Sequence, residues 1–386
     1  MHKLRTLTAG IAAAAAIAVV ASAAVPALAD PPASGGKQIV PKIYDIVSVG
    51  ANTDENLFNA LSGSYDATIP AKKHNAAHPY VYTWNATKPG STSTAKTTIV
   101  PKAGCKTITR PNGSSAGLTA LEETQVVTVG KTAYSCINFA RTSSGRSSTS
   151  PSPKPGGVGY VALAEDAVTY ATRDKGATKT VPDTYAPKSL TLAQLKAIFL
   201  CTDTTWGQVG GTKNQPIKAY LPQPGSGTLS FWLKTLGITA PGSCVSEAPE
   251  ENQGQSSFFN SPNAIFIYSV ADWIAQQYHS PLPGHKPTKS QNQFGTNQTG
   301  YLGLDKIDGI SPVTTAKVPA INKAFSATHF TRTIYDIVRW VAAGDHIPAT
   351  LNPILSRTGY FCHNTKAVTL IKDYGFLPAL TCGSVS

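Results

Sequence analysis

Short runs of β-branched and aromatic residues alternate along the chain with segments whose apolar residues recur every three or four positions. The run Ile43–Val49 is typical of a buried strand, and the spacing of Leu57, Phe58 and Leu61 behind it indicates a helix. The same order recurs downstream, with strands expected at 137–139, 159–163, 217–221 and 264–268 and helices at 118–123, 192–199, 229–236 and 270–278. Such alternation predicts an α/β fold with mostly parallel sheets.

Toward the carboxyl end the same pattern predicts two more helices. Four apolar residues within 334–341 are spaced as on one face of an amphipathic helix. A last helix around 368–371 would end at Gly375, because glycine readily adopts the left-handed conformation that closes a helix. The segments 145–158 and 279–299 are rich in polar residues, Gly and Pro, and we expect surface loops there.

The amino end has the pattern of a targeting segment. Lys3 and Arg5 precede the apolar stretch Leu7–Val25, and Ala27–Ala29 supplies the small residues of a signal-peptidase site. We therefore expect residues 1–29 to be a cleaved signal peptide and the protein to be secreted. No Cys lies near the site, so no lipid anchor is expected; a retained membrane anchor is the alternative.

Length and charge narrow the classes of protein. The chain has 386 residues, which favours two or three domains. Only 14% of them are charged, which argues against charge-driven disorder and against a coiled coil. The net charge of +12 falls by two, to +10, when Lys3 and Arg5 are removed, and this balance favours anionic ligands or surroundings. Because the basic residues are scattered without a basic run, no nucleic-acid partner is expected.

Export makes the cysteines interpretable. Six of them lie beyond the cleavage site, and an even number in an oxidising compartment indicates disulfides. Fifteen pairings are possible, and we expect the nearest-neighbour set: Cys105–Cys136, Cys201–Cys244 and Cys362–Cys382. Neither the CxxC nor the HExxH spacing occurs, so we expect no metal site and no cofactor.

Three loops share one design, in which a strand leads through Ser, Thr and Gly into the start of a helix. They are 50–54, 113–117 and 225–228. A helix amino end offers unpaired N–H groups and a partial positive charge. Hydroxyl groups add donors, and glycine lets the backbone approach closely. Together the loops predict a site for a small oxyanion.

These loops also carry a family resemblance. The segment Leu190–Phe231 contains Leu-Thr, Ile-Phe, Trp, Gly-Gly and Gly-Ser-Gly-Thr in an order similar to that of the phosphate-binding proteins of ABC transporters, the PstS type. Residues 113–117 resemble the Gly-Ser-Ser-Gly-Gly loop of that family, residues 139–143 lie where it carries Phe-Gly-x-Ser-Asp, and residues 49–53 resemble its first glycine-rich loop. The resemblance spans roughly residues 43–275.

The resemblance implies a two-lobed, periplasmic-binding-protein-like fold of type II. Each lobe would be a mostly parallel sheet flanked by helices, with hinge strands between the lobes and the ligand in the cleft. Residues 40–165 and 266–386 would form lobe I, and residues 166–265 would form lobe II. The implied function is that of a monomeric, exported solute-binding protein without enzymatic activity. It would capture an inorganic oxyanion, with phosphate as the expected ion, and present it to an ABC permease.

Carried over position by position, the resemblance implies that the anion accepts hydrogen bonds from six residues: Thr53, Ser114, Thr142, Ser226, Gly227 and Thr228. Ser115 and Gly117 would shape the loop at the helix start.

The chain departs from the family at two charged positions. The family usually has an Arg and an Asp just before Gly-Ser-Gly-Thr, where this chain has Leu221–Pro224. The family's Asp that accepts the proton of hydrogen phosphate aligns with Ser143. We expect Asp54 to replace that acceptor and Arg141, whose planar fork suits oxyanions, to replace the missing Arg. The alternatives are a helix-start carboxylate for Asp54 and a solvated surface charge for Arg141.

A secreted hydrolase is a rival interpretation. Gly113–Gly117 also fits the G-x-S-x-G turn that carries a nucleophilic serine, here Ser115. The acid and base of such an esterase would come from Asp345–His346 or His363. A phosphatase would use Ser226 or Thr228, but either residue needs a neighbouring base, and none is near in the sequence.

A basic cell-wall protein is the other rival. A chain of charge +10 could be held on anionic wall polymers by charge alone, without a pocket and without a role in transport. Such binding would weaken steeply with salt.

Overall fold

The computed structural model describes residues 30–31, 33–34, 37–88, 96–148, 150–174, 183–278, 299–340 and 346–386. The predicted signal peptide and nearly all of the loop expected at 279–299 lie outside these residues. Among the described residues, no helix has the length and apolar character needed to cross a membrane.

Within the described residues, one mixed sheet of nine strands runs in the order β12-β13-β10-β16-β9-β3-β4, and β14 and β17 also pair with β10. The bounds are β3 (Ile46–Gly50), β4 (Val81–Thr83), β9 (Phe139–Thr142), β10 (Val158–Arg173), β12 (Lys218–Ala219), β13 (Ala264–Ser269), β14 (Leu302–Leu304), β16 (Thr331–Arg339) and β17 (Leu377–Pro378). The shorter strands are β1 (Ala33–Ser34), β2 (Lys37–Gln38), β5 (Thr98–Ile99), β6 (Ile108–Thr109), β7 (Val126–Val129), β8 (Thr132–Ser135), β11 (Ser189–Leu190) and β15 (Lys306–Ile307).

The helices follow the strands much as the apolar pattern predicts. They are α1 (Glu55–Asp66), α2 (Ser114–Glu122), α3 (Leu192–Phe199), α4 (Gly227–Leu236), α5 (Val270–Tyr278), α6 (Lys323–Ser326), α7 (Asn352–Leu355), α8 (Tyr360–His363) and α9 (Thr365–Asp373). Local chemistry sets several of their ends. Thr191 and Gln194 form a capping box that begins α3, and Gly237, with φ of 62°, closes α4.

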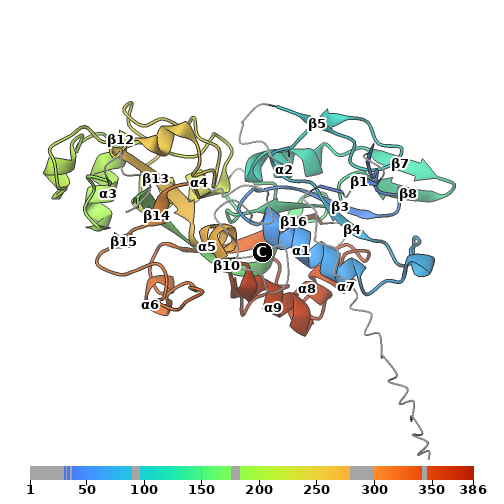
Figure 1. Ribbon diagram of the computed structural model, residues 1–386. Coiled ribbons are helices and arrows are strands. Elements are labelled where there is room, and N and C mark those ends of the chain that lie inside the picture. The colour runs from blue at the N-terminus through green and yellow to red at the C-terminus, as the bar shows by residue number, and fades with distance from the viewer. Residues whose placement is uncertain are drawn as a thin grey trace, which may run out of the picture.

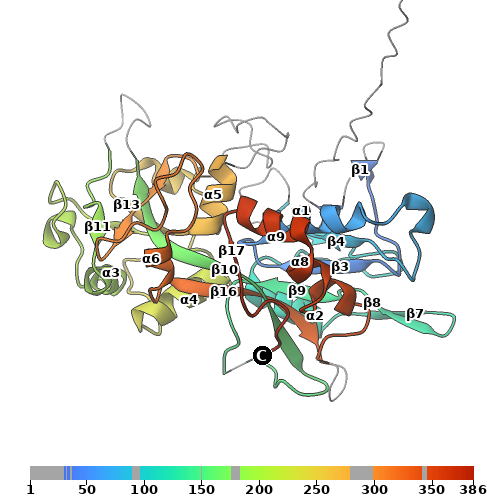
Figure 2. The same cartoon turned by 90° about the horizontal axis from the view of Figure 1, so that it is seen from below.

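The sheet is mixed rather than mostly parallel. Strand β3 is parallel to β4 and β9, and β12 is parallel to β13. Between these groups, the 16-residue β10 is antiparallel to β13 and β16, and β16 is antiparallel to β9. The long strands β10 and β16 therefore connect two parallel groups, which corresponds to the expected hinge strands. Figure 1 shows them between the elements around α3, α4 and β13 and the elements around α1, α2 and β3, and Figure 2 shows the same order from below.

The segment 334–341 was expected to be a helix, but residues 334–339 are instead the end of β16, so that prediction is wrong; residue 341 lies outside the described residues. Residues alternate in burial along the first half of the strand, and then three successive residues are buried. A central strand is covered on both faces, so its apolar residues need not alternate and can mimic helical spacing. The β-branched Thr331, Thr333, Ile334 and Ile337 favour the extended form.

Apolar residues gather into two groups of clusters, one in each half of the sheet. In the first half, Ile46 faces a cluster that includes α1, α8 and α9, and Val47 and Val49 face a second cluster beneath α2. In the other half the main cluster includes α3, α4 and β13, and also Ile307 and Phe325. We therefore propose that the second lobe takes in the rest of β13, up to Ser269, and residues 299–330 as well as 166–265.

The three disulfides are those expected from the sequence. Cys105–Cys136, Cys201–Cys244 and Cys362–Cys382 are bonded, with Cα atoms 5.9, 5.9 and 5.6 Å apart. Each closes a local loop within one half of the molecule.

Candidate anion-binding site

The loops predicted to bind an anion lie together at the ends of strands and the starts of helices. They are Ala51–Asp54 before α1, Gly113–Ser115 at α2, Arg141–Ser143 at the end of β9, and Gly225–Thr228 at α4. The N–H of Ser143 donates to Ser114 Oγ at 3.1 Å, within the first half. The N–H of Ser115 donates to the carbonyl of Gly225 at 3.2 Å, which joins the two halves.

Glycines allow this close approach. A Cβ atom on Gly113, which has φ of 95°, would lie 2.7 Å from the carbonyl oxygen of Gly225. A Cβ atom on Gly227 would lie 2.4 Å from both Ser114 Oγ and Ser143 Oγ. These distances are below van der Waals contact, so a side chain at either glycine would push the loops or the hydroxyls apart. The start of α4 therefore faces the hydroxyl groups of Ser114 and Ser143 from the first half.

A second group of polar atoms lies beside the first. The hydroxyl oxygens of Thr53 and Thr228 are 3.3 Å apart and come from opposite halves. Thr53 donates to Glu251 Oε1 at 2.7 Å, and Thr228 donates to the same oxygen. Arg332 Nη2 is 2.8 Å from Thr228 Oγ1 and 3.4 Å from Thr53 Oγ1. All four residues are almost completely buried.

Arg332 is held in place by Asp166. Its Nε and Nη2 donate to Asp166 Oδ2 at 3.1 and 2.9 Å, and its guanidinium carbon lies 5.4 Å from the centre of the Phe231 ring. The pairing of β10 with β16 sets this contact, because Asp166 and Arg332 are register partners. Nη1 is buried and has no hydrogen-bond partner within the described part of the chain. One carboxylate therefore fixes the guanidinium, and the Nη1 group of Arg332 keeps N–H donors that are not used within the described residues.

Comparison with known proteins identifies the architecture. The profile of a family described as the PBP superfamily domain matches residues 86–319. The chain belongs to the PBP superfamily. The expected two-lobed, periplasmic-binding-protein-like α/β fold is therefore confirmed.

Solved structures of similar fold agree. One is a putative phosphate ABC transporter substrate-binding protein with bound phosphate from Clostridium perfringens, with a TM-score of 0.52, 14% identity and coverage of 87% of this chain and 99% of that one. Another is an ABC-type phosphate transport receptor from Vibrio cholerae, with a TM-score of 0.50, 15% identity and coverage of 87% and 100%. At this identity the likeness concerns the fold. A search of curated proteins finds no match.

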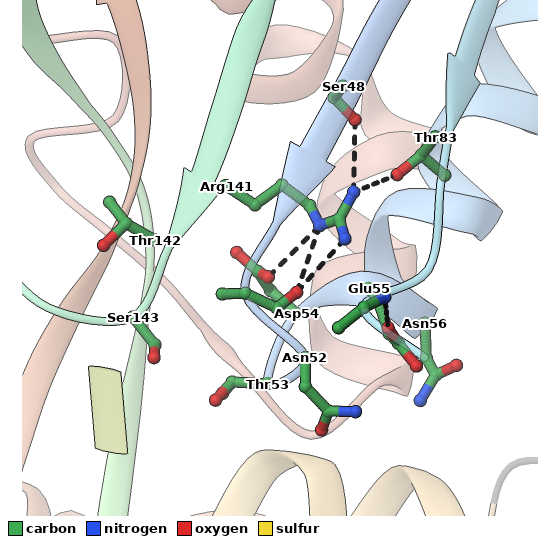
Figure 3. A network of polar contacts seen from close by, with 12 residues as sticks. Ser48, Asn52, Thr53, Asp54, Glu55, Asn56, Thr83, Arg141, Thr142 and Ser143 are labelled. Atoms are coloured by element: carbon green, nitrogen blue, oxygen red, sulfur yellow. Dashed lines mark hydrogen bonds and ion pairs between the residues drawn. The ribbon is translucent and has the colours of Figure 1, made fainter. Parts of the chain in front are cut away.

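In this PBP-superfamily chain, Arg141 is completely buried, and all three of its guanidinium nitrogens donate within the protein (Figure 3). Its acceptors are the carbonyls of Ala51 and Trp84 and the hydroxyls of Ser48 and Thr83. Arg141 is therefore neither a solvated surface charge nor a free donor. It braces the loop that carries Thr53.

Asp54 faces Arg141 (Figure 3), with Oδ1 at 3.5 Å from Nε. Both carboxylate oxygens are buried and have no hydrogen-bond partner among the described residues. Burial raises the pKa of Asp54 to about 7, although the charge of Arg141 opposes the shift. Asp54 is also the N-cap residue of α1, without a side-chain cap bond. It follows Thr53 in the sequence, and no hydrogen bond among the described residues joins its carboxylate to the hydroxyl groups around α4.

The remaining predicted residues differ in their positions. Ser226 Oγ accepts the N–H of Leu229 at 3.1 Å and so caps α4. Figure 3 shows Thr142 pointing to the other side of β9 from Arg141. The Thr142 hydroxyl donates to the carbonyl of Ser144. Ser143 Oγ is buried without a hydrogen-bond partner in the described chain.

The rival hydrolase interpretation would require a base beside Ser115. Ser115 is exposed, and no described hydrogen bond joins its hydroxyl to a histidine or a carboxylate. Within the described ranges, no group of three or more His, Cys, Asp and Glu residues is placed to hold a metal ion.

The sequence interpretation missed Arg332, Asp166 and Glu251. None of them belongs to a recognisable motif, and Arg332 lies 104 residues after Thr228. The only sequence signal is that Arg332 and Asp166 are charged residues in segments otherwise rich in apolar and β-branched residues.

Proposed function

We propose that this protein captures inorganic phosphate between its two lobes and delivers it to an ABC permease. The observation that carries the proposal is a set of buried donors that converge from both lobes. Arg332 Nη1 and Ser143 Oγ have no hydrogen-bond partner in the described chain. The hydroxyls of Ser114, Thr53 and Thr228 lie beside them.

The surrounding helices suit an anion. Helices α2 and α4, of nine and ten residues, both begin at this point, and their first N–H groups are unpaired within the helix. In a buried site each hydrogen bond to a charged ion is worth about 1.5–3 kcal/mol. A guanidinium adds a charge matched to tetrahedral oxyanions. The phosphate named for the Clostridium and Vibrio structures supports the choice of ion.

This function needs no covalent step, and we assign the protein no catalytic role. Cleavage after Ala29 would release it outside the cell, as a monomer of net charge +10. That charge would help retain it on anionic cell-wall polymers, close to the permease.

The test is a calorimetric titration of phosphate into the dialysed mature protein, residues 30–386, with sulfate as the control ion. We expect one phosphate to bind per chain, more tightly than sulfate. The absence of heat with both ions, at several temperatures, would contradict the proposal.

A further inference from the structure

Three consecutive buried residues of the second half form a clasp on the first half. These residues, Glu250, Glu251 and Asn252, are each no more than 2% exposed. Each bonds to a different residue in or directly beside the candidate anion-site loops: Asn112 Nδ2 donates to Glu250 Oε2 at 3.0 Å, Thr53 Oγ1 donates to Glu251 Oε1 at 2.7 Å, and Asn252 Nδ2 donates to Asn52 Oδ1 at 3.2 Å. We call residues 250–252 the clasp.

The clasp is fixed to its own half. Gln223 donates to Glu250 Oε1 at 2.9 Å and accepts the N–H of Glu251 at 2.7 Å. The N–H of Ser269, at the end of β13, donates to Asn252 Oδ1 at 3.2 Å. Because these bonds tie the clasp to the second half, its bonds to Asn52, Thr53 and Asn112 are bonds between the two halves.

Glu251 uses the donors that an anion would need. Its Oε1 accepts both threonine hydroxyls, from Thr53 and Thr228. A hydroxyl has a single proton to donate, so it cannot serve Glu251 and a bound anion at the same time. Glu251 Oε2 is buried and has no hydrogen-bond partner in the described chain.

We propose that Glu251 is an internal anion, which holds the two lobes together in the absence of ligand and which phosphate must displace from Thr53 and Thr228. This inference rests on the proposed function. Displacement lowers the net affinity for phosphate, because the two charge-assisted bonds to the carboxylate are given up when the ion binds. It also eases release, since the carboxylate returns to the same hydroxyls as the ion leaves.

The test compares wild-type protein with Glu251→Gln. The amide keeps the shape and one acceptor oxygen but not the charge, and hydrogen bonds to neutral acceptors are roughly half as strong. We expect calorimetry to show phosphate binding on the order of 10-fold tighter in Glu251→Gln. We also expect X-ray scattering in phosphate-free buffer to show a larger radius of gyration for Glu251→Gln than for wild type. Glu247→Gln, a partly exposed residue of the same loop, is the matched control and should change neither quantity.

Each other result overturns the inference. Weaker phosphate binding in Glu251→Gln would indicate that the carboxylate accepts the proton of the bound phosphate and does not compete with phosphate for the threonine hydroxyls. Unchanged phosphate affinity and an unchanged radius of gyration would show that the clasp plays no part in phosphate binding. If neither protein bound phosphate, the proposed function would fail, and scattering alone would then decide whether Glu251 closes the lobes. If Glu251→Gln did not fold, Glu251→Asp would replace it in the test. The shorter carboxylate of Glu251→Asp draws back from the threonines, so this variant should also bind phosphate more tightly than wild type.

Discussion

Ser143 offers a clean way to separate binding from folding. Its side chain is fully buried, and its Oγ has no hydrogen-bond partner in the described chain. A buried hydroxyl without a partner costs about 1–3 kcal/mol of stability, because it has lost its bond to water. Replacing it with the apolar methyl group of alanine removes that cost. We therefore expect Ser143→Ala to fold normally and to be as stable as wild type or about 1 kcal/mol more stable.

Binding should respond in the opposite direction. Ser143 Oγ lies against the first residue of α4, on the side where Ser114 Oγ also lies. If the hydroxyl donates to phosphate, its removal deletes a hydrogen bond to a charged group, worth about 1.5–3 kcal/mol. At about 1.4 kcal/mol for each tenfold change, the Kd for phosphate should rise about 10- to 150-fold.

Ser62→Ala is the matched control for this experiment. Ser62 is also buried, at 4% exposed, and its hydroxyl has no partner in the described chain, but it lies in the second half of α1. It should match Ser143→Ala in thermal stability and match wild type in phosphate titration. If Ser143→Ala melts normally and binds phosphate as tightly as wild type, the Ser143 hydroxyl does not donate to phosphate and the reasoning is refuted.

Three further outcomes are expected. Gly227→Ala should bind phosphate at least 10-fold more weakly, because its Cβ would displace two serine hydroxyls, whereas the Cβ of Gly145→Ala meets only a ring atom at 3.6 Å and should leave titration unchanged. Burial raises the pKa of Glu55 from 4.5 to about 8, so the folded protein holds this proton where the unfolded chain has released it, and stability falls as the pH rises from about 5 to 8. Urea unfolding at pH 5 and pH 8 should show a smaller fall in the free energy of unfolding for Glu55→Gln than for wild type. An equal fall in both proteins would contradict the assignment of the pH dependence to Glu55. Replacing Cys201 and Cys244 by Ser opens a loop of sequence separation 43 and should cost about 4 kcal/mol in urea unfolding; a loss below about 1 kcal/mol would mean that the bond does not constrain the unfolded chain.

Local chemistry explains why much of the fold could be predicted. The capping pair Thr191 and Gln194 and the terminal glycines lie within a few residues of the helices they delimit, so the sequence displays them directly. The wrongly predicted strand β16 lies in the middle of the sheet, where both faces are covered. Its neighbours β9 and β10 determine its burial, and they lie far from it in the sequence.

The candidate anion site divides in the same way. Residues 113–115 and 225–228 could be proposed from the sequence because each belongs to a short run of Gly, Ser and Thr next to a helix start. The positions of the two arginines could not be found in this way. Arg141 stands beside the expected loop, yet its donors bind carbonyls and hydroxyls of the first half. Arg332 has no motif around it and reaches the site only through strand pairing.

The place of Arg332 in the fold has a consequence for how an anion would be held. Arg332 and Asp166 are paired on β16 and β10, the two long strands that connect the halves of the sheet. Its Nη2 contacts Thr53 from one half and Thr228 from the other. In hinge closure the connecting segments move less than the loops they carry. The guanidinium can therefore remain in place while the hydroxyls of each lobe approach or leave it. An arginine on one of the closing loops would instead move away from the hydroxyls of the other lobe whenever the lobes opened, so the connecting strands are the position from which one fixed charge can serve both lobes.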